Sequence, residues 1–173
     1  MTVRMRVFVD EQHFSADAEI DEDDARSWHW VISATTAPGT SIPVAKPYEL
    51  LTHPETILES SYDWTHEPCI KLSRVAVLRE YRGLGLGRKL IQVALEWAAH
   101  HAAEIDDAAA QVAARSHWTG KPARWQGLVV IHAQADVEGM YRRSGFQTDE
   151  TLERWDEEGV EHVGMFRRVE VAR

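Results

Sequence analysis

The second half of the chain alternates between hydrophobic spacings that predict strands and spacings that predict helices. Apolar residues at steps of three and four over Gly87–Ile105 predict an amphipathic helix. The continuous apolar run in Gly127–Gln134 predicts a central strand covered on both faces. The other elements expected in this half are strands at Cys69–Val77 and Val160–Val171, a turn at Glu158-Gly159, and a short helix at Ala135–Ser144 that Gly145 closes before Phe146 opens a strand. This alternation predicts an α/β or α+β sheet with parallel pairing at its centre.

Patterns in the first half of the chain are weaker. Val3–Gln12 alternates apolar and charged residues in a spacing that fits a strand and a short helix equally well. The aromatic and β-branched run Trp28–Ile32 predicts a strand. The other features expected are a hairpin partner for that strand at Ile42–Ala45, a long surface loop at 47–68, and an insert at 106–126 that is helical and then irregular.

Composition and charge narrow the class of protein. The chain has 173 residues, 44% of them apolar, which fits one globular domain over residues 1–173. Acidic residues outnumber basic residues by 28 to 19, and the net charge of −9 argues against nucleic acid or an anionic membrane as a partner. No apolar run approaches the roughly 18–20 residues of a membrane span, and no signal-peptide core follows Met1, so we expect a cytoplasmic protein. The single cysteine, Cys69, excludes an intramolecular disulfide and a cysteine-rich zinc site, and we expect no metal.

The glycine-rich stretch Arg82–Arg88, between a predicted strand and a predicted helix, is the candidate anion-binding turn. A Walker A loop and a dinucleotide fingerprint both fail here, because Arg88 stands where each needs a glycine. The pattern Arg-x-x-Gly-x-Gly, formed by Arg82, Gly85 and Gly87, fits a turn whose backbone N–H groups bind a pyrophosphate at a helix start. A turn that only starts the helix is the alternative.

Two longer stretches resemble a known family. Leu72–Leu90 resembles motif A of the GNAT superfamily of acyl-CoA-dependent N-acetyltransferases, and Tyr141–Phe146 resembles the Tyr-x-x-x-Gly-Phe that follows the family's fifth strand. The segments similar to the ElaA-like branch are Val7–Gln12, Glu19–Asp21, His132–Gln134 and Glu158–Met165. The resemblance implies the GNAT fold, a mixed and strongly curved sheet with helices on both faces. It also implies that acetyl-CoA lies in a split between the two central parallel strands.

The resemblance implies roles for individual residues as well. Backbone groups around Val75 and Val77 would bind the pantetheine arm of acetyl-CoA. The pyrophosphate would be held by the turn, that is by Arg82, Gly83, Leu84, Gly85 and Gly87, together with Arg88. Gln134 stands where the family commonly has an asparagine that touches the cofactor arm. Tyr141 matches the tyrosine often assigned to protonate the departing thiolate, and a tyrosine that merely packs under the sheet is the alternative. The implied reaction is transfer of the acetyl group to a primary amine of a small molecule or peptide by direct attack.

Two features depart from the family pattern. The family usually has a first strand before the segment that Val3–Gln12 resembles, so either the N-terminus is truncated or the sheet lacks an edge strand. Many relatives also carry a glutamate on the strand equivalent to Cys69–Val77, where this chain offers only Lys71, Ser73 and Arg74. These departures leave open a catalytically inactive CoA-binding regulatory module, or a scaffold that binds no nucleotide.

The remaining candidate site residues are acids, histidines and tryptophans. The amine's proton could pass through water to Asp136, Glu67 or an acid of Glu19–Asp24, and those acids could attract a cationic amine or form a solvated acidic face. His162 is expected either on the substrate side or facing solvent, and His132 in the core. Tryptophans 28, 30 and 97 suit core packing, whereas tryptophans 118, 125 and 155 are candidates to line a substrate cleft. The thiol of Cys69 is expected to be packed in the core.

Overall fold

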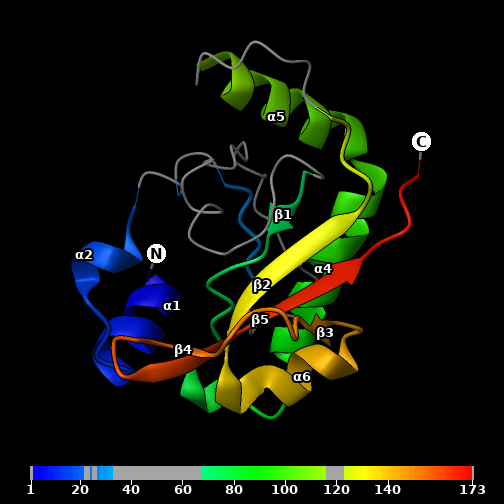
Figure 1. Ribbon diagram of the computed structural model, residues 1–173. Helices are drawn as coiled ribbons and strands as arrows, with labels where there is room; N and C mark the ends of the chain where they lie inside the picture. The colour runs from blue at the N-terminus through cyan, green and yellow to red at the C-terminus, as the bar shows by residue number, and fades with distance from the viewer. Residues whose placement is uncertain (1, 22–23, 25–26, 33–67, 116–122, 173) are drawn as a thin grey trace, which may run out of the picture.

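Figure 1 shows the computed structural model, which describes residues 2–21, 24, 27–32, 68–115 and 123–172. The elements in chain order are α1 (Thr2–Arg4), the π-helix η1 (Met5–Glu11), α2 (Ala16–Glu19), β1 (Ile70–Lys71), the 3-10 helix η3 (Arg79–Tyr81), α4 (Leu86–His100), α5 (Ala102–Arg115), β2 (Leu128–Gln134), the 3-10 helix η4 (Ala135–Val137), α6 (Glu138–Arg143), β3 (Gln147–Thr148), β4 (Trp155–Glu157) and β5 (Val160–Arg168). None of the described helices has the length and apolar character to span a membrane.

The strands form one mixed sheet in the order β1-β2-β5-β3, with β4 also paired to β5. β1 runs parallel to β2, with Ile70 opposite Val129. β2 and β5 are antiparallel along the whole of β2, from Leu128 opposite Arg168 to Gln134 opposite His162. The predicted class, a mixed sheet that contains a parallel pair and is packed with helices, is therefore confirmed.

One face of the sheet carries the hydrophobic core. Ile91, Leu95 and Ala98 of α4 follow one another at steps of four and three and are all buried. They pack in one cluster with residues of the two long strands and of the α6 region, namely Val129, Ile131, Ala133, Val163, Met165, Tyr141 and Phe146. The apolar spacing predicts a stripe formed by Leu90, Val93, Ala94, Trp97 and Ala98. Only Ala94 and Ala98 of these are fully buried, because the face turned to the core is centred on Ile91 and Leu95.

The opposite face of β2 is reached by the N-terminal helices. Side chains alternate along a strand, so His132 and Gln134 point away from the core that holds Ile131 and Ala133. The Gln134 amide is hydrogen-bonded to Gln12, which follows η1. Figure 1 shows the N-terminal helices beside the end of β2 where that contact is made. Of the two alternatives for Val3–Gln12, the helix is correct.

The strand predicted at Trp28–Ile32 is wrong, because these residues have no regular secondary structure. The rings of Trp28 and Trp30 pack instead against Trp97 on α4, with centroids 4.5 Å and 5.7 Å from the Trp97 ring. Trp28 and Trp97 lie against the core, as expected. Side-chain packing rather than a backbone ladder fixes this segment.

The helix predicted over Gly87–Ile105 is divided in two at His101. The backbone N–H of His101 bonds to the carbonyl of Ala98, and its ring Nδ1 donates to the carbonyl of Trp97 at 2.7 Å. Both bonds use carbonyls of the last turn of α4 and end that helix, and α5 starts at Ala102. The helical extension expected after residue 106 is confirmed as far as Arg115.

Other element ends differ from the prediction by a few residues. Gly145 ends the helical region with a φ of +84°, Phe146 is buried, and the strand opens one residue later, at Gln147. The last strand stops at Arg168 rather than at Val171. The turn at Glu158-Gly159 is present, with both φ values positive. The Cys69 thiol is buried beside Val130, as expected. The predictions for Ile42–Ala45 and for residues 47–67 fall outside the described residues.

Two glycines provide a test of the packing around β2. An alanine Cβ at Gly127, where φ is +90°, would lie 2.1 Å from the carbonyl oxygen of Val169, whereas at Gly159, where φ is +84°, it would meet nothing within 4 Å. Gly159→Ala should cost only the strain of a positive φ, about 1–2 kcal/mol. Gly127→Ala should cost about 3–5 kcal/mol in urea unfolding, because strain and a backbone clash add. Equal losses in the two variants would contradict this packing.

Candidate active site

The two parallel strands separate immediately after β1. The last backbone bond between them runs from the Leu72 N–H to the Val130 carbonyl, at 2.9 Å. Arg74 then adopts a φ of +53°, which is uncommon for a residue with a side chain, and turns the chain away from β2. Residues 73–77 consequently make no backbone–backbone hydrogen bond within the described part of the chain. The strand predicted at Cys69–Val77 is therefore correct only at its start, and its second half borders an open split.

The stretch beyond the ladder contains two of the predicted cofactor contacts. Val75 packs against the core cluster while its backbone lies outside any ladder. Val77 lies two residues further on and accepts a hydrogen bond at its carbonyl from Arg82 Nε, at 3.0 Å. Unpaired N–H and C=O groups on one side of a split form an edge to which an extended amide chain can add.

The glycine-rich turn leads from this stretch into α4. Gly83 and Gly85 have φ values of +79° and +75°, and no atom lies within 4 Å of where a Cβ would stand at either. Leu84 between them is 69% exposed, so its side chain takes no part in the core. A Cβ added at Gly87 would lie 3.5 Å from Met140 Sδ on α6 and 3.7 Å from Val77 Cγ2. Gly87 is therefore close both to α6 and to the end of the split.

The start of α4 fits a bound anion. Gly85 is the N-cap and provides no side-chain cap, so the first N–H groups of this 15-residue helix keep their capacity for a ligand. The open space above Gly83 and Gly85 leaves room for the ligand itself. Arg88, in the first turn of α4, is exposed and forms no ion pair or hydrogen bond with any residue that the structure describes. A pyrophosphate meets these requirements.

The guanidinium of Arg82 is already engaged. It forms a two-pronged ion pair with Glu11, with N–O distances of 2.5 Å and 2.8 Å. The hydrogen bond to Glu11 raises the pKa of Arg82, and the one from Arg82 lowers the pKa of Glu11. Arg82 therefore fixes the shape of the turn through Glu11 and Val77, and its backbone N–H already donates to the Arg79 carbonyl at 3.3 Å. The N–H groups of the turn that keep their capacity for a ligand begin at Gly83.

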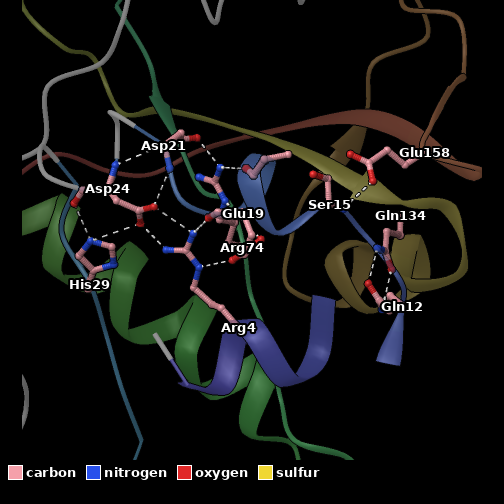
Figure 2. A network of polar contacts seen from close by, with 11 residues as sticks. Arg4, Gln12, Ser15, Glu19, Asp21, Asp24, His29, Arg74, Gln134 and Glu158 are labelled. Atoms are coloured by element: carbon pink, nitrogen blue, oxygen red, sulfur yellow. Dashed lines mark hydrogen bonds and ion pairs between the residues drawn. The ribbon is translucent and has the colours of Figure 1, made fainter. Parts of the chain in front are cut away.

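Glu11 and Gln12 join the two sides of the split. Glu11 holds Arg82 on the side that follows β1, and Gln12 holds Gln134 at the end of β2. The two amides form a reciprocal pair, with N–O distances of 2.9 Å and 3.4 Å, and each amide keeps one further N–H and one lone pair. Figure 2 shows this pair beside a second link, in which the Ser15 N–H donates to Glu158 at 2.8 Å.

A network of ion pairs, nearly buried at Arg4 and more exposed at Asp21, supports the bend at Arg74. Arg74 is paired with Asp21, donates to the Ala18 carbonyl at 3.2 Å, and has its Nε 3.7 Å from Glu19 Oε2. Arg4 bonds to the same Glu19 and to Asp24, as Figure 2 shows. Two arginines from distant parts of the chain thus share one set of carboxylates.

This network changes the interpretation of the acidic run Glu19–Asp24. The Glu19 side chain is only 7% exposed, so the expectation of a solvated acidic face is wrong for this residue. Burial has the largest single effect and would raise the pKa of Asp24. The hydrogen bonds and charge of Arg4, the bond from the Asp21 N–H and the charge of Arg74 together outweigh burial and hold that pKa below its usual value. The lowered pKa leaves Asp24 poorly suited to accept an amine's proton, and the Glu19 carboxylate is already in contact with Arg4 and Arg74. Asp136 is exposed on η4, and Glu67 lies outside the described residues.

Tyr141 lies on α6 in the core, where its ring meets Phe146 edge-on at 5.8 Å. Burial raises its pKa to about 12, so its hydroxyl keeps its proton at neutral pH. The packing of the ring is thereby established, and the role as proton donor stays a prediction.

Three aromatic predictions have different outcomes. Trp125 is buried in the core and its Nε1 donates to the Leu128 carbonyl at 2.8 Å, so the cleft assignment is wrong. Trp155 lies beside His132 on the open face of the sheet, with ring centroids 4.8 Å apart. The solvent-facing alternative for His162 is wrong, because that side chain is buried and bonds to the Val160 carbonyl. Trp118 falls outside the described residues.

The links made by Arg4, Glu11 and Gln12 could not be read from the sequence. Their only signal is that Val7–Gln12 and Glu19–Asp21 are similar to segments of one family branch. Similarity marks a segment, but it does not tell which distant residue the segment contacts.

Arg4 and Arg6 provide a matched test of the network. The Arg4 side chain is 14% exposed between two buried carboxylates, whereas Arg6 is 52% exposed in its pair with Glu80. Arg4→Ala should cost about 3–5 kcal/mol in urea unfolding at pH 7, because it leaves buried charges unpaired. Arg6→Ala should cost about 1 kcal/mol or less.

The loss caused by Arg4→Ala should also depend on pH. Because Arg4 holds the pKa of Asp24 below its usual value, the stabilisation is present above about pH 4 and is lost as the pH falls further. The difference in unfolding free energy between Arg4→Ala and the unmodified protein should therefore shrink below about pH 4. A difference that is small at pH 7, or that grows in acid, would contradict a stabilising role of the pair.

Comparison with known proteins agrees with this geometry. The profile of the acetyltransferase (GNAT) family matches residues 53–118. Protein ElaA of Escherichia coli strain K12 is 30% identical over 169 residues, which cover 98% of this chain and 85% of ElaA, and protein ElaA of Shigella flexneri matches equally well.

Three crystal structures share the fold. A protein from Lactobacillus plantarum has a TM-score of 0.56 and 23% identity, over 96% of this chain and 86% of its own. The structure of Escherichia coli ElaA has a TM-score of 0.51 and 25% identity, over 96% of this chain and 86% of its own. The structure of an acyl-CoA N-acyltransferase from Pseudomonas aeruginosa has a TM-score of 0.53 and 24% identity, over 96% of this chain and 85% of its own. The chain belongs to the acetyltransferase (GNAT) family and is a homologue of ElaA.

Proposed function

We propose that this protein transfers an acetyl group from acetyl-CoA to a primary amine of a small molecule or peptide by direct attack. The observation that carries the proposal is the continuity of the split with the anion-binding turn. The unpaired backbone of residues 73–77 leads directly into a turn with two positive-φ glycines and an uncapped helix start. An extended amide arm that ends in a pyrophosphate, as in coenzyme A, matches both parts.

The two parts would bind different regions of acetyl-CoA. Backbone groups around Val75 and Val77 hydrogen-bond the amides of the pantetheine arm. The N–H groups from Gly83 to Gly87, with the exposed cation of Arg88, hold the pyrophosphate. Gln134 keeps one N–H and one lone pair beyond its pair with Gln12, and these serve the cofactor arm.

The chemistry needs a proton donor for the leaving sulfur and donors for the developing oxyanion. As the amine nitrogen bonds to the carbonyl carbon and the C–S bond breaks, Tyr141 delivers its proton to the thiolate. The amine nitrogen loses one proton to water, and water returns a proton to the Tyr141 oxygen. Its raised pKa means that the hydroxyl carries that proton throughout the physiological range. A backbone N–H near Val75 stabilises the oxyanion, a contribution of about 2–4 kcal/mol in comparable sites.

The test of the proposal is release of free thiol from acetyl-CoA in the presence of a panel of amines. Amine-dependent release, with the acetylated amine identified by mass spectrometry, is the expected result. Calorimetry with CoA separates the alternatives. Binding without release with any amine would indicate a regulatory module, and no binding would indicate a scaffold.

Tyr141→Phe should lower kcat about 100-fold or more without changing the Kd for acetyl-CoA, because a general acid acts only as the thiolate departs. Tyr81→Phe, which removes an exposed hydroxyl from η3, is the matched control and should retain the original kcat. Equal kcat values for the two variants would remove Tyr141 from the mechanism.

The pH profile gives a second measurement on the same residue. With its pKa at about 12, Tyr141 stays protonated, so loss of its proton should not lower kcat between about pH 8 and pH 10. A fall in kcat over that interval that disappears in Tyr141→Phe would contradict the raised pKa.

A further inference from the structure

His132 projects from β2 next to the point where the split opens. It lies two residues beyond Val130, whose carbonyl accepts the last bond from the β1 side. Because side chains alternate along β2, His132 lies on the face opposite the core that holds Tyr141. Tyr141 and His132 therefore lie on opposite faces of the sheet.

The ring of His132 is fixed by aromatic contacts and not by hydrogen bonds. The Trp155 ring lies at 79° to it, with centroids 4.8 Å apart. The same Trp155 ring stacks on His162 at 22° and 6.0 Å. One indole from β4 thus lies between a histidine of β2 and a histidine of β5.

The Nε2 atom of His132 is fully buried and has no hydrogen-bond partner. It is the sole such side-chain nitrogen or oxygen among the residues that the structure describes. Other histidines of the chain behave differently, since His100, His101 and His162 each donate a ring N–H to a backbone carbonyl. A buried polar atom without a hydrogen-bond partner destabilises the fold. Its presence here indicates that a bound ligand supplies the missing hydrogen bond.

The surroundings of His132 keep its ring neutral. Burial has the largest effect, and the positive charge of Lys71 on β1 and His162 on β5, which stands opposite Gln134, add to it, lowering the pKa of His132 to about 4. The neighbour from β4, Trp155, carries no charge. The carboxylate of Glu157, also on β4, lies 4.0 Å from the ring of His162 and pairs with that histidine. At neutral pH the ring therefore offers a hydrogen bond but no charge.

We propose that His132 is the acceptor-binding residue: its Nε2 atom hydrogen-bonds the attacking amine on the face opposite Tyr141, and the acceptor is an amine that is uncharged at neutral pH and rests against the Trp155 ring. The proposal rests on the acetyltransferase function proposed above. A neutral amine donates an N–H to Nε2 and keeps its lone pair for the thioester carbon. An ammonium has no lone pair for the thioester carbon, and the positive charge of Lys71 acts against a second cation beside His132.

A pair of substitutions separates this role from a structural one. His132→Phe keeps the ring and its contact with Trp155 but removes the nitrogen. It should raise the KM for the amine at least tenfold and leave the Kd for acetyl-CoA unchanged. His132→Gln, which can set an amide near the position of Nε2, should restore part of the loss.

Stability provides an independent readout. His132→Phe should raise the Tm, because a buried nitrogen without a partner is removed. The gain should grow as the pH falls from 7 to about 5, since the unfolded chain binds a proton near pH 6.5 and the folded chain only near pH 4. His162→Phe should lower the Tm, because it loses the bond to the Val160 carbonyl.

The acceptor class is tested with two amines that both carry a benzene ring. 4-Methoxyaniline, neutral at pH 7, should have a kcat/KM at least tenfold above that of benzylamine, which is charged. The kcat/KM for benzylamine should rise with pH up to its own pKa, while that for 4-methoxyaniline should not. A preference for benzylamine at pH 7 would overturn the acceptor class.

The outcomes also distinguish this inference from the proposed function. No thiol release by the unmodified protein with any amine would overturn both. An active protein in which His132→Phe lowers the Tm and leaves the amine KM unchanged would overturn the role of His132 alone. A higher Tm combined with a raised amine KM supports it.

Discussion

The candidate site depends on one interruption in backbone hydrogen bonding, at the end of β1. In a continuous parallel pair, alternate residues between Ser73 and Val77 would spend their N–H and C=O groups on β2, and no split would exist. The positive φ of Arg74 prevents that pairing, at a cost of about 1–2 kcal/mol for a residue with a side chain. The ion pairs of Arg74 with the α2 region offset this cost, and Arg4 balances the remaining negative charge. The ion pairs of the N-terminal acidic run thereby help to keep residues 73–77 unpaired with β2.

The sequence predicts the repetitive elements and the glycine turn well, because each has a local physical signature. The apolar residues of α4 and of β2 occur where the chain is buried, and Gly85 occurs where the backbone takes a conformation that residues with side chains disfavour. The composition of Trp28–Ile32 predicts a strand, yet strand formation needs a partner, which composition does not reveal. The end of β1 at Lys71 was missed for the same reason, since it is fixed by ion pairs with residues more than 50 positions away.

The N-terminal helices connect parts that the sheet alone leaves separate. Glu11 and Gln12 are neighbours in the chain, yet they hold the turn on one side of the split and the end of β2 on the other. They come at the end of η1, a π-helix, a form that is rare and frequent at functional sites. The width of the split is therefore set by side chains of one helical turn as well as by the sheet.

The electrostatic environment changes along the split in a way that matches acetyl-CoA. At the turn, the backbone of Gly83 and Gly85 and the side chain of Arg88 are exposed, and positive charge and N–H groups face solvent. At the other end, burial acts on both Tyr141 and His132, raising one pKa to about 12 and lowering the other to about 4. The same desolvation thus keeps both groups uncharged at neutral pH. A charged pyrophosphate and an uncharged thioester need these two environments in this order, and the bend at Arg74 is what joins them in one continuous path.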